Sequence, residues 1–161
     1  MTSVNRDFEE IKTILAKSVL VQGLTENELE LVGNNAVKSQ HKKGTRILEE
    51  KTESRDLFII YDGEASVKMA MNTMHFMEES VARLSDGDIF GEFSFINGEP
   101  RSATIQAEKK VSLIHFKYDD LIKLFEENPR IGYIMIHNLA VIATKRIKEN
   151  HLKMRKLLLS Y

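Results

Sequence analysis

The segment from 38 to 117 constrains the fold most, because it has the pattern of short strands separated by turn residues every 8 to 15 positions. Its strongest local signal is "DLFIIYDGEASVKM", where Asp62-Gly63 lies between two apolar runs and predicts a β-hairpin. "SVARLSDGDIF" and "ATIQAEKKVSLIHFK" repeat the arrangement. Parallel strands need long crossover connections, and none is present here. This segment is therefore expected to be antiparallel, as a barrel or a sandwich.

Helical patterns flank the strand segment on both sides. Before it, apolar residues recur at helical spacing from Phe8 onward, and Thr25 followed by Glu28 predicts a capping box. After it, "YDDLIKLFEENP" predicts a short amphipathic helix that stops near Pro129. The rest has no proline for about 30 residues, roughly 45 Å as one helix. The expected organisation is a single α+β domain in three parts: helices over 1–37, strands over 38–117 and helices over 118–161.

Composition limits the classes of function. The chain has 161 residues, a net charge of −1 and no cysteine, so nucleic acid is not an expected partner and disulfide or thiolate chemistry is excluded. The start, "MTSVNRDFEEIKTIL", lacks the basic-then-apolar pattern of a signal peptide. No apolar run approaches the roughly 18 residues of a membrane span. We therefore expect a cytoplasmic protein with no membrane partner.

Charge is distributed unevenly along the chain. Residues 129–161 contain seven Lys or Arg and one acid, Glu149, so this end carries +6 and the remainder −7. Such a basic segment is either a solvated helix face or a docking surface for an acidic protein partner. The sequence leaves both roles open.

The stretch "GDIFGEFSFINGEPRSATIQA" interrupts the strand pattern with residues that suit a ligand. "GEFSFI" predicts one helical turn whose free N–H groups point at an anion, and Gly91 lets the backbone approach it. Arg101 supplies a planar fork of donors for phosphate, to which Ser102 adds a hydroxyl and Ala103 an amide. Glu92, an acceptor when ionised, suits the hydroxyls of a sugar. The alternative is a salt bridge between Glu92 and Arg101, worth about 0 to 1 kcal/mol if exposed.

These residues resemble the phosphate-binding cassette of cyclic nucleotide-binding domains of the catabolite activator protein type. The matching positions, in a cassette at 87–103, are Phe90, Gly91, Glu92, Ser94, Pro100, Arg101, Ser102 and Ala103. Phe93 and Phe95 stand where leucines are commoner, and Lys51-Thr52 where many members have glycine and an acid. The resemblance extends over nearly the whole chain. It implies an antiparallel β-barrel or jelly roll (a double-stranded β-helix) with N-terminal helices and a long C-terminal helix.

The resemblance also implies roles for residues of the cassette. Glu92 would bind the ribose 2′-hydroxyl of a cyclic nucleotide, and Arg101 its cyclic phosphate. Ser102 would also bind the phosphate, while Gly91 and Ala103 would contribute backbone amides. The ligand would be cAMP or cGMP, and the sequence does not distinguish the two.

Three further positions are expected at the ligand. Phe93 and Ser94 lie inside the cassette and are included among the ligand-binding residues. In the resembling family the last helix usually covers the base, which places Arg146 there. Arg146 would either stack on the purine or extend into solvent. Thr144 and Ile147 are neighbouring candidates.

We expect the C-terminal helix to transmit the effect of ligand binding to a partner. Transcription factors of the family continue into a helix-turn-helix domain, whereas this chain ends at Tyr161, so we expect a stand-alone sensor without a DNA-binding domain. The stripe Ile131, Met135, Leu139 and Ile142 has i, i+4 spacing. It could form a homodimer seam or pack against the chain's own barrel, and because the helix is apolar on more than one face it could do both. We expect a homodimer through this helix.

The sequence also bears on two other functions, an enzyme and a scaffold. An enzyme is not expected, because no Ser/His/Asp arrangement stands out and the five histidines are scattered without the spacing of metal ligands. The alternative to a nucleotide sensor is a degenerate family member that binds no nucleotide and acts as a scaffold for protein interactions. The presence of both Glu92 and Arg101 favours the sensor.

Overall fold

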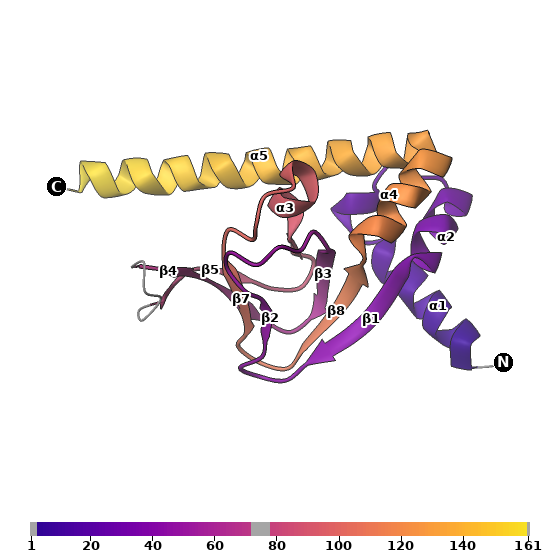
Figure 1. The fold of residues 1–161 in the computed structure, drawn as a ribbon, viewed down its shortest axis with the longest axis horizontal. Coiled ribbons are helices and arrows are strands. Elements are labelled where there is room, and N and C mark those ends of the chain that lie inside the picture. Colours follow the sequence, from indigo (N-terminus) through magenta and orange to yellow (C-terminus); the bar gives the residue numbers. More distant parts are fainter. Residues whose placement is uncertain (1–2, 72–77, 161) are drawn as a thin grey trace.

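Two four-stranded antiparallel sheets form the centre of the fold, and helices pack against the outer face of the first (Figure 1). The computed structural model describes residues 3–71 and 78–160. The helices are α1 (Ser3–Leu15), the 3-10 helix η1 (Val19–Val21), α2 (Glu26–Asn34), α3 (Glu92–Asn97), α4 (Tyr118–Glu127) and α5 (Pro129–Leu159). The strands are β1 (Ala36–His41), β2 (Arg46–Leu48), β3 (Leu57–Asp62), β4 (Ala65–Ala70), β5 (Glu78–Leu84), β6 (Ile89–Phe90), β7 (Thr104–Ala107) and β8 (Val111–Phe116).

The strand order confirms an antiparallel jelly roll but corrects the predicted hairpins. The first sheet has the order β1-β8-β3-β6 and the second β2-β7-β4-β5. Strands joined by tight turns therefore lie in different sheets. The hairpin predicted at Asp62-Gly63 is wrong, and so are the similar pairings predicted for β5 with β6 and for β7 with β8. Instead, β3 pairs with β8 and β4 with β7, both antiparallel.

The turn at Gly63 is fixed by another turn rather than by a strand partner. Gly63 has a φ of 103°, and a Cβ there would lie 2.3 Å from the carbonyl oxygen of Lys110. The amide of Glu108 donates to the carbonyl of Glu64 at 2.9 Å. The turns after β3 and after β7 thus pack on each other. An Asp-Gly turn with positive φ serves a crossing between sheets as well as a hairpin.

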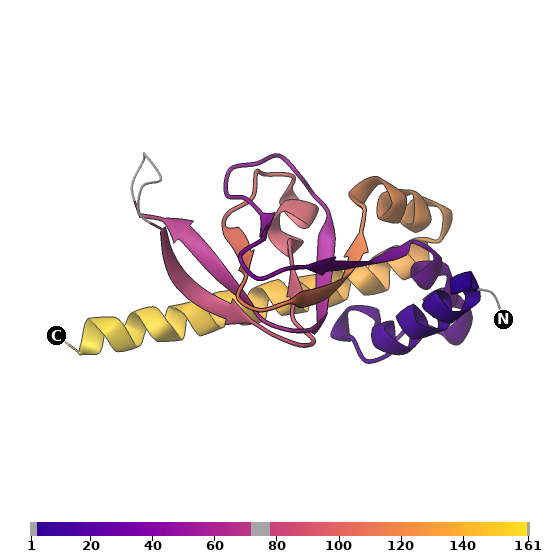
Figure 2. The same cartoon turned by 90° about the horizontal axis from the view of Figure 1, so that it is seen from below.

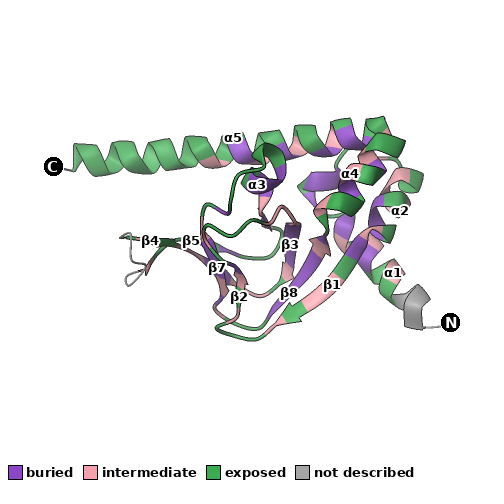
Figure 3. Ribbon diagram, viewed as in Figure 1, coloured by how far each residue is buried: buried purple, intermediate pink, exposed green. Residues whose placement is uncertain are grey.

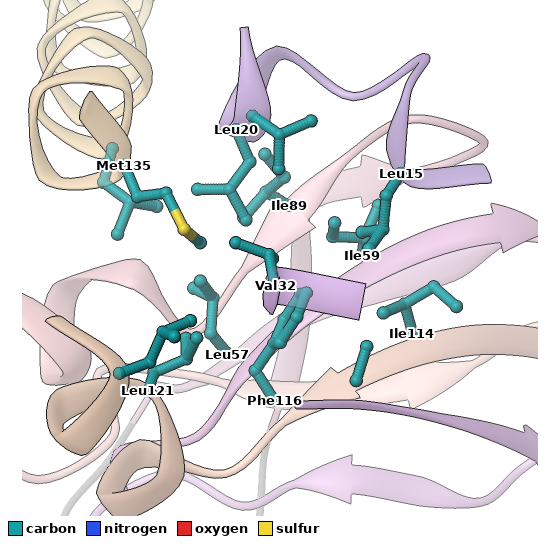
Figure 4. Close-up of a cluster of buried hydrophobic side chains, with 14 of the residues drawn as sticks. Leu15, Leu20, Val32, Leu57, Ile59, Ile89, Ile114, Phe116, Leu121 and Met135 are labelled. Carbon is teal, nitrogen blue, oxygen red and sulfur yellow. The ribbon is translucent and has the colours of Figure 1, made fainter. Parts of the chain in front are cut away.

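The first sheet is buried on both faces, which explains the continuous apolar run of β3. Phe58 and Ile60 point into the space between the sheets, where they pack with residues of the second sheet. Leu57 and Ile59 point the other way and pack against the helices (Figure 4). Fully burying such a side chain contributes roughly 1.5–3 kcal/mol. Each residue of β3 thus joins one of two cores on either side of the sheet.

The N-terminal helices form as the sequence predicts. Thr25 caps α2. Its side-chain hydroxyl accepts a hydrogen bond from the amide of Glu28, and the Glu28 carboxylate accepts one from the amide of Thr25, so the capping box is present. Cluster members from α1 and α2, including Leu15 and Val32, are fully buried against the first sheet. Within the described ranges, no helix is long and apolar enough to cross a lipid bilayer.

The long helix α5 has a packed half and a projecting half (Figure 2). Ile131, Met135 and Leu139 are at most 1% exposed, since they pack against the body of the same chain. Of the two roles expected for this stripe, intramolecular packing is confirmed, and these side chains are not available as a dimer seam. Asn138 adds hydrogen bonds to carbonyls of the η1 region. Beyond Ala143 the helix is mostly exposed (Figure 3).

Candidate ligand-binding site

A pocket of about 560 Å³ lies among the second sheet, α3 and the projecting half of α5. It is lined by all eight residues that the sequence predicts at the ligand: Gly91, Glu92, Phe93, Ser94, Arg101, Ser102, Ala103 and Arg146. Its apolar wall consists of Leu48, Val67, Met69, Val81, Leu84, Phe90 and Ile105. The pocket therefore has a polar end at the cassette and an apolar wall that lies on the second sheet, apart from Phe90 of β6.

Helix α3 begins in the pocket, as predicted, but its glycine has a different reason. Gly91 precedes the helix with a φ of 88°. A Cβ at this position would lie 2.6 Å from the carbonyl oxygen of Asp56 and 2.8 Å from Nη1 of Arg101. From the sequence, the expected role of Gly91 is to let the backbone approach a ligand. The structure shows that the neighbouring backbone and Arg101 already exclude a side chain there.

Arg101 is a buried cation without a counterion among the described residues. The residue is 3% exposed. Nε donates to Ser54 Oγ at 2.7 Å, Nη1 to the carbonyl of Gly91 at 3.1 Å and Nη2 to the carbonyl of Asp56 at 2.7 Å. All three acceptors are neutral. Burial lowers the pKa of Arg101, while the carboxylates of Asp56 and Glu92 act in the opposite direction.

Arg55 holds the end of α3, a role that the sequence analysis missed. Its Nε and Nη2 donate to the carbonyls of Ser94 and Phe95 at 3.1 and 2.9 Å. Its guanidinium carbon lies 3.8 Å from the centre of the Tyr118 ring. Cations at the C-terminal end of a helix are favourable, so Arg55 stabilises the turn that carries Glu92. Only the fold brings Arg55 to α3, because about 40 residues separate them.

The connection between β2 and β3 also fixes the backbone of Arg101. The amide of Lys51 donates to the carbonyl of Arg101 at 2.8 Å, and the amide of Arg101 donates to the carbonyl of Thr52 at 2.9 Å. Lys51 has a φ of 67°, a conformation that favours glycine. This is the position where resembling domains often have glycine. Lysine at this position thus still adopts the left-handed backbone conformation.

Glu92 pairs with α5 rather than with Arg101. Its side chain is 3% exposed and forms an ion pair with the guanidinium of Arg146, which also donates to the carbonyl of Ile89. The predicted salt bridge between Glu92 and Arg101 is therefore wrong. The expectation that Arg146 extends into solvent is wrong as well. A charge-assisted pair instead connects the cassette to the long helix.

The other α5 residues at the pocket differ from those predicted. Thr144 and Ile147 are exposed and do not line it, so these two neighbouring candidates are wrong. Glu149, Asn150 and Lys153 line it instead. They follow Arg146 by three, four and seven residues, the spacing of one helix face. This spacing was the signal in the sequence that could have identified them.

Comparison with known proteins agrees with the geometry of the site. The family model described as "Cyclic nucleotide-binding domain" matches residues 38–128, more than half of the chain. The chain is 31% identical over 108 residues to a cGMP-dependent protein kinase of Plasmodium berghei, covering 67% of this chain and 12% of the kinase. It is 25% identical over 137 residues to the cyclic AMP receptor protein of Thermus thermophilus, covering 85% of this chain and 61% of that protein.

Solved structures show the same fold. A cyclic nucleotide-binding domain from Methylobacillus flagellatus superimposes with a TM-score of 0.81 at 24% identity, over 94% of this chain and 84% of that one. By contrast, the chain corresponds to only about an eighth of the length of the Plasmodium kinase it matches. The likeness therefore concerns one domain of such proteins.

Proposed function

Because this chain belongs to the cyclic nucleotide-binding domain family, we propose that its pocket binds cAMP or cGMP and that α5 passes the signal to a partner. The chain would act as a regulatory domain without catalytic activity of its own. Residues 1–161 would form a single domain, made of helices over 1–37, strands over 38–117 with the cassette at 87–103, and helices over 118–161.

The observation that carries the proposal is the buried charge of Arg101, which forms no ion pair with any residue that the structure describes. Burying a cation without a counterion is costly, and proteins keep such groups mainly where they act on a ligand. Of the five N–H donors of a guanidinium, three are used in the protein, which leaves two for an anion. A phosphate oxygen pair is the planar acceptor that suits such a fork.

The overall charge of the pocket fits an anion with a single charge. Four cations and three anions line it, which gives a formal net charge of +1: Arg83, Arg101, Arg146 and Lys153 against Asp88, Glu92 and Glu149. A cyclic phosphodiester carries one negative charge. The apolar wall on β4, β5 and β7 suits a nucleobase, as in other ligand pockets with few polar groups.

Further roles follow for the remaining cassette residues. Glu92 has one carboxylate oxygen paired with Arg146, so we propose that the other accepts the ribose 2′-hydroxyl. Ser102 and the amides of Gly91 and Ala103 would contact the phosphate. Phe93 and Ser94 complete this end of the pocket.

Glu92 is also the proposed link between ligand and output. Among the residues that the structure describes, the hydrogen bonds from the projecting half of α5 to the body come from Arg146 alone, to Glu92 and Ile89. A ribose hydroxyl bound to the second oxygen of Glu92 would draw on the same carboxylate charge as Arg146. Ligand binding would therefore change how firmly the projecting half of α5 is held.

The partner that α5 meets is proposed to be a second copy of the chain. An uncharged stripe runs the length of the helix and consists of Tyr133, Ile136, Ala140, Ile147, His151, Met154 and Leu158, all exposed. Successive members are three, four or seven residues apart, the spacing of a two-helix seam. The stripe replaces the buried seam that the sequence predicts. The basic residues beside it are the surface for any acidic protein partner.

The test is a calorimetric titration with cAMP and with cGMP, using protein freed of co-purified ligand. We expect micromolar or tighter binding of at least one nucleotide. Arg101→Ala should weaken it about ten- to a hundredfold, the scale of a hydrogen bond to a charged group. Arg46→Ala is the matched control, because Arg46 pairs with Glu78 on the surface and does not line the pocket.

Two outcomes would contradict the proposal or part of it. No heat with either nucleotide would favour the alternative, a degenerate member that acts as a scaffold for protein interactions. Glu92→Gln should weaken binding less than Arg101→Ala, since a neutral amide still accepts a hydrogen bond. The opposite order would mean that the roles of the two residues are wrongly assigned.

A further inference from the structure

Three polar side chains that line the pocket from α5 have no task in the site described so far. Glu149, Asn150 and Lys153 line it from α5, and none of them has a hydrogen-bond or ion-pair partner among the described residues. Glu149 and Lys153 are four residues apart, a spacing at which opposite charges on a helix commonly pair. In this structure they do not pair. Their carboxylate and ammonium groups are therefore both available to a ligand.

Their position along α5 places them beyond the sugar-phosphate end of the pocket. Arg146 meets Glu92 at that end, and Glu149 and Lys153 follow it by about 4.5 and 10.5 Å along the helix axis. On the opposite side of the pocket stand Val67 and Val81 from β4 and β5. With the phosphate at Arg101, the base would extend between this apolar wall and the free side chains of α5.

The chemistry of the two charged groups discriminates between purines. A carboxylate accepts two adjacent hydrogen bonds, and guanine offers such a pair in its N1–H and exocyclic N2–H₂ groups. An ammonium group donates, and guanine offers its O6 carbonyl as an acceptor. Adenine presents only one donor group, N6–H₂, next to the lone pair of N1. The carboxylate would gain one hydrogen bond from adenine instead of two.

We infer that Glu149 and Lys153 make this pocket select guanine, so that the chain binds cGMP in preference to cAMP. Glu149 accepts from N1–H and N2–H₂, and Lys153 donates to O6. Asn150 carries both a donor and an acceptor, so it fits either base and does not discriminate. This inference rests on the proposed function and names the ligand of the same site.

The experiment measures the ratio of the dissociation constants of cAMP and cGMP. The wild-type protein should bind cGMP about tenfold more tightly, the lower end of the range for a hydrogen bond to a charged group. Glu149→Gln should remove about tenfold of cGMP affinity and reduce cAMP affinity much less, because adenine offers the carboxylate only one hydrogen bond. Lys153→Gln should reduce cGMP affinity less. Glu127→Gln, a change at an exposed glutamate at the end of α4, should alter neither constant.

A ratio of affinities cancels any loss of folded protein, so each outcome is decisive. If the wild-type protein binds cAMP as tightly as cGMP, or if Glu149→Gln leaves the ratio unchanged, the inference is wrong while the proposed function stands. If neither nucleotide binds to the wild-type protein, the proposed function itself is wrong.

Discussion

Gly91 shows at the scale of a single residue how the cassette is tied to the rest of the fold. Because glycine has no Cβ, the Asp56 carbonyl and the guanidinium of Arg101 can both lie close to its Cα. A side chain there would push on the group that we propose binds phosphate. The residue thus acts on the ligand through the position of Arg101, whether or not a ligand approaches its own backbone.

We predict that Gly91→Ala weakens both folding and ligand binding. Gly87 provides a matched control, because it has the same φ of 88° but nothing within 4 Å of the position of a Cβ. Gly87→Ala should cost about 1–2 kcal/mol of stability from its backbone conformation alone. Gly91→Ala should cost at least about 1 kcal/mol more, on the scale of an overpacked site.

Urea denaturation of the two variants gives the free energies of unfolding, and calorimetry gives their affinities for cyclic nucleotide. Only Gly91→Ala should lower the affinity. Equal effects of both substitutions on stability and binding would mean that the close approach of Arg101 to Gly91 has no consequence.

Much of the candidate site could be predicted from single residues. Every position matched to the cassette except Pro100 lines the pocket, because the cassette is one local segment whose residues are placed by short-range backbone geometry. Ser54 and Arg55 could not be predicted. They reach Arg101 and α3 from a segment about 40 or more residues away, and no local pattern records that contact.

At the scale of elements, the strands were predictable and their partners were not. The turn and strand signals identified β3 and β4 and the glycine between them. A hairpin and a crossing between sheets use the same turn chemistry, and the hydrophobic pattern of each strand is satisfied in either arrangement. What decides between them is the packing of the turn at Gly63 on the turn before β8. This is a contact between distant parts of the chain.

The two halves of α5 are held by different forces, and this difference can be tested. Apolar burial fixes the first half, whereas a polar contact of Arg146 tethers the second. We predict that Arg146→Ala speeds amide hydrogen exchange about tenfold in residues 147–158, the effect of losing a hydrogen bond to a charged group. Exchange in residues 131–139 should not change.

Arg155→Ala is the control for that measurement, since Arg155 is exposed on the same half of the helix and has no partner among the described residues. It should leave the exchange of both halves as in the wild-type protein. Identical exchange in the Arg146 and Arg155 variants would show that the tether does not hold α5.

At the scale of the whole molecule, α5 is shared between the pocket and the outer surface. One face carries Arg146, Glu149 and Lys153 into the pocket, and the uncharged stripe lies on another. Because α5 is a rigid helix, any change in its contacts with the pocket therefore also displaces the uncharged stripe. A ligand-dependent change in association with a second copy is the simplest output of this arrangement.

The association of two copies is the last prediction. Ile147 and Met154 lie in the uncharged stripe and are 44% and 57% exposed, whereas Val141 and Leu152 are each 49% exposed on another side of α5. We expect the wild-type protein to form a dimer in sedimentation equilibrium, and the double change Ile147→Glu and Met154→Glu to abolish it. The matched double change Val141→Glu and Leu152→Glu should keep the dimer.

Because α5 has seven basic residues and one acid, added salt should screen the repulsion between copies and tighten the wild-type dimer. A monomer at all concentrations, or equal loss of association in both double variants, would contradict the assignment of the stripe.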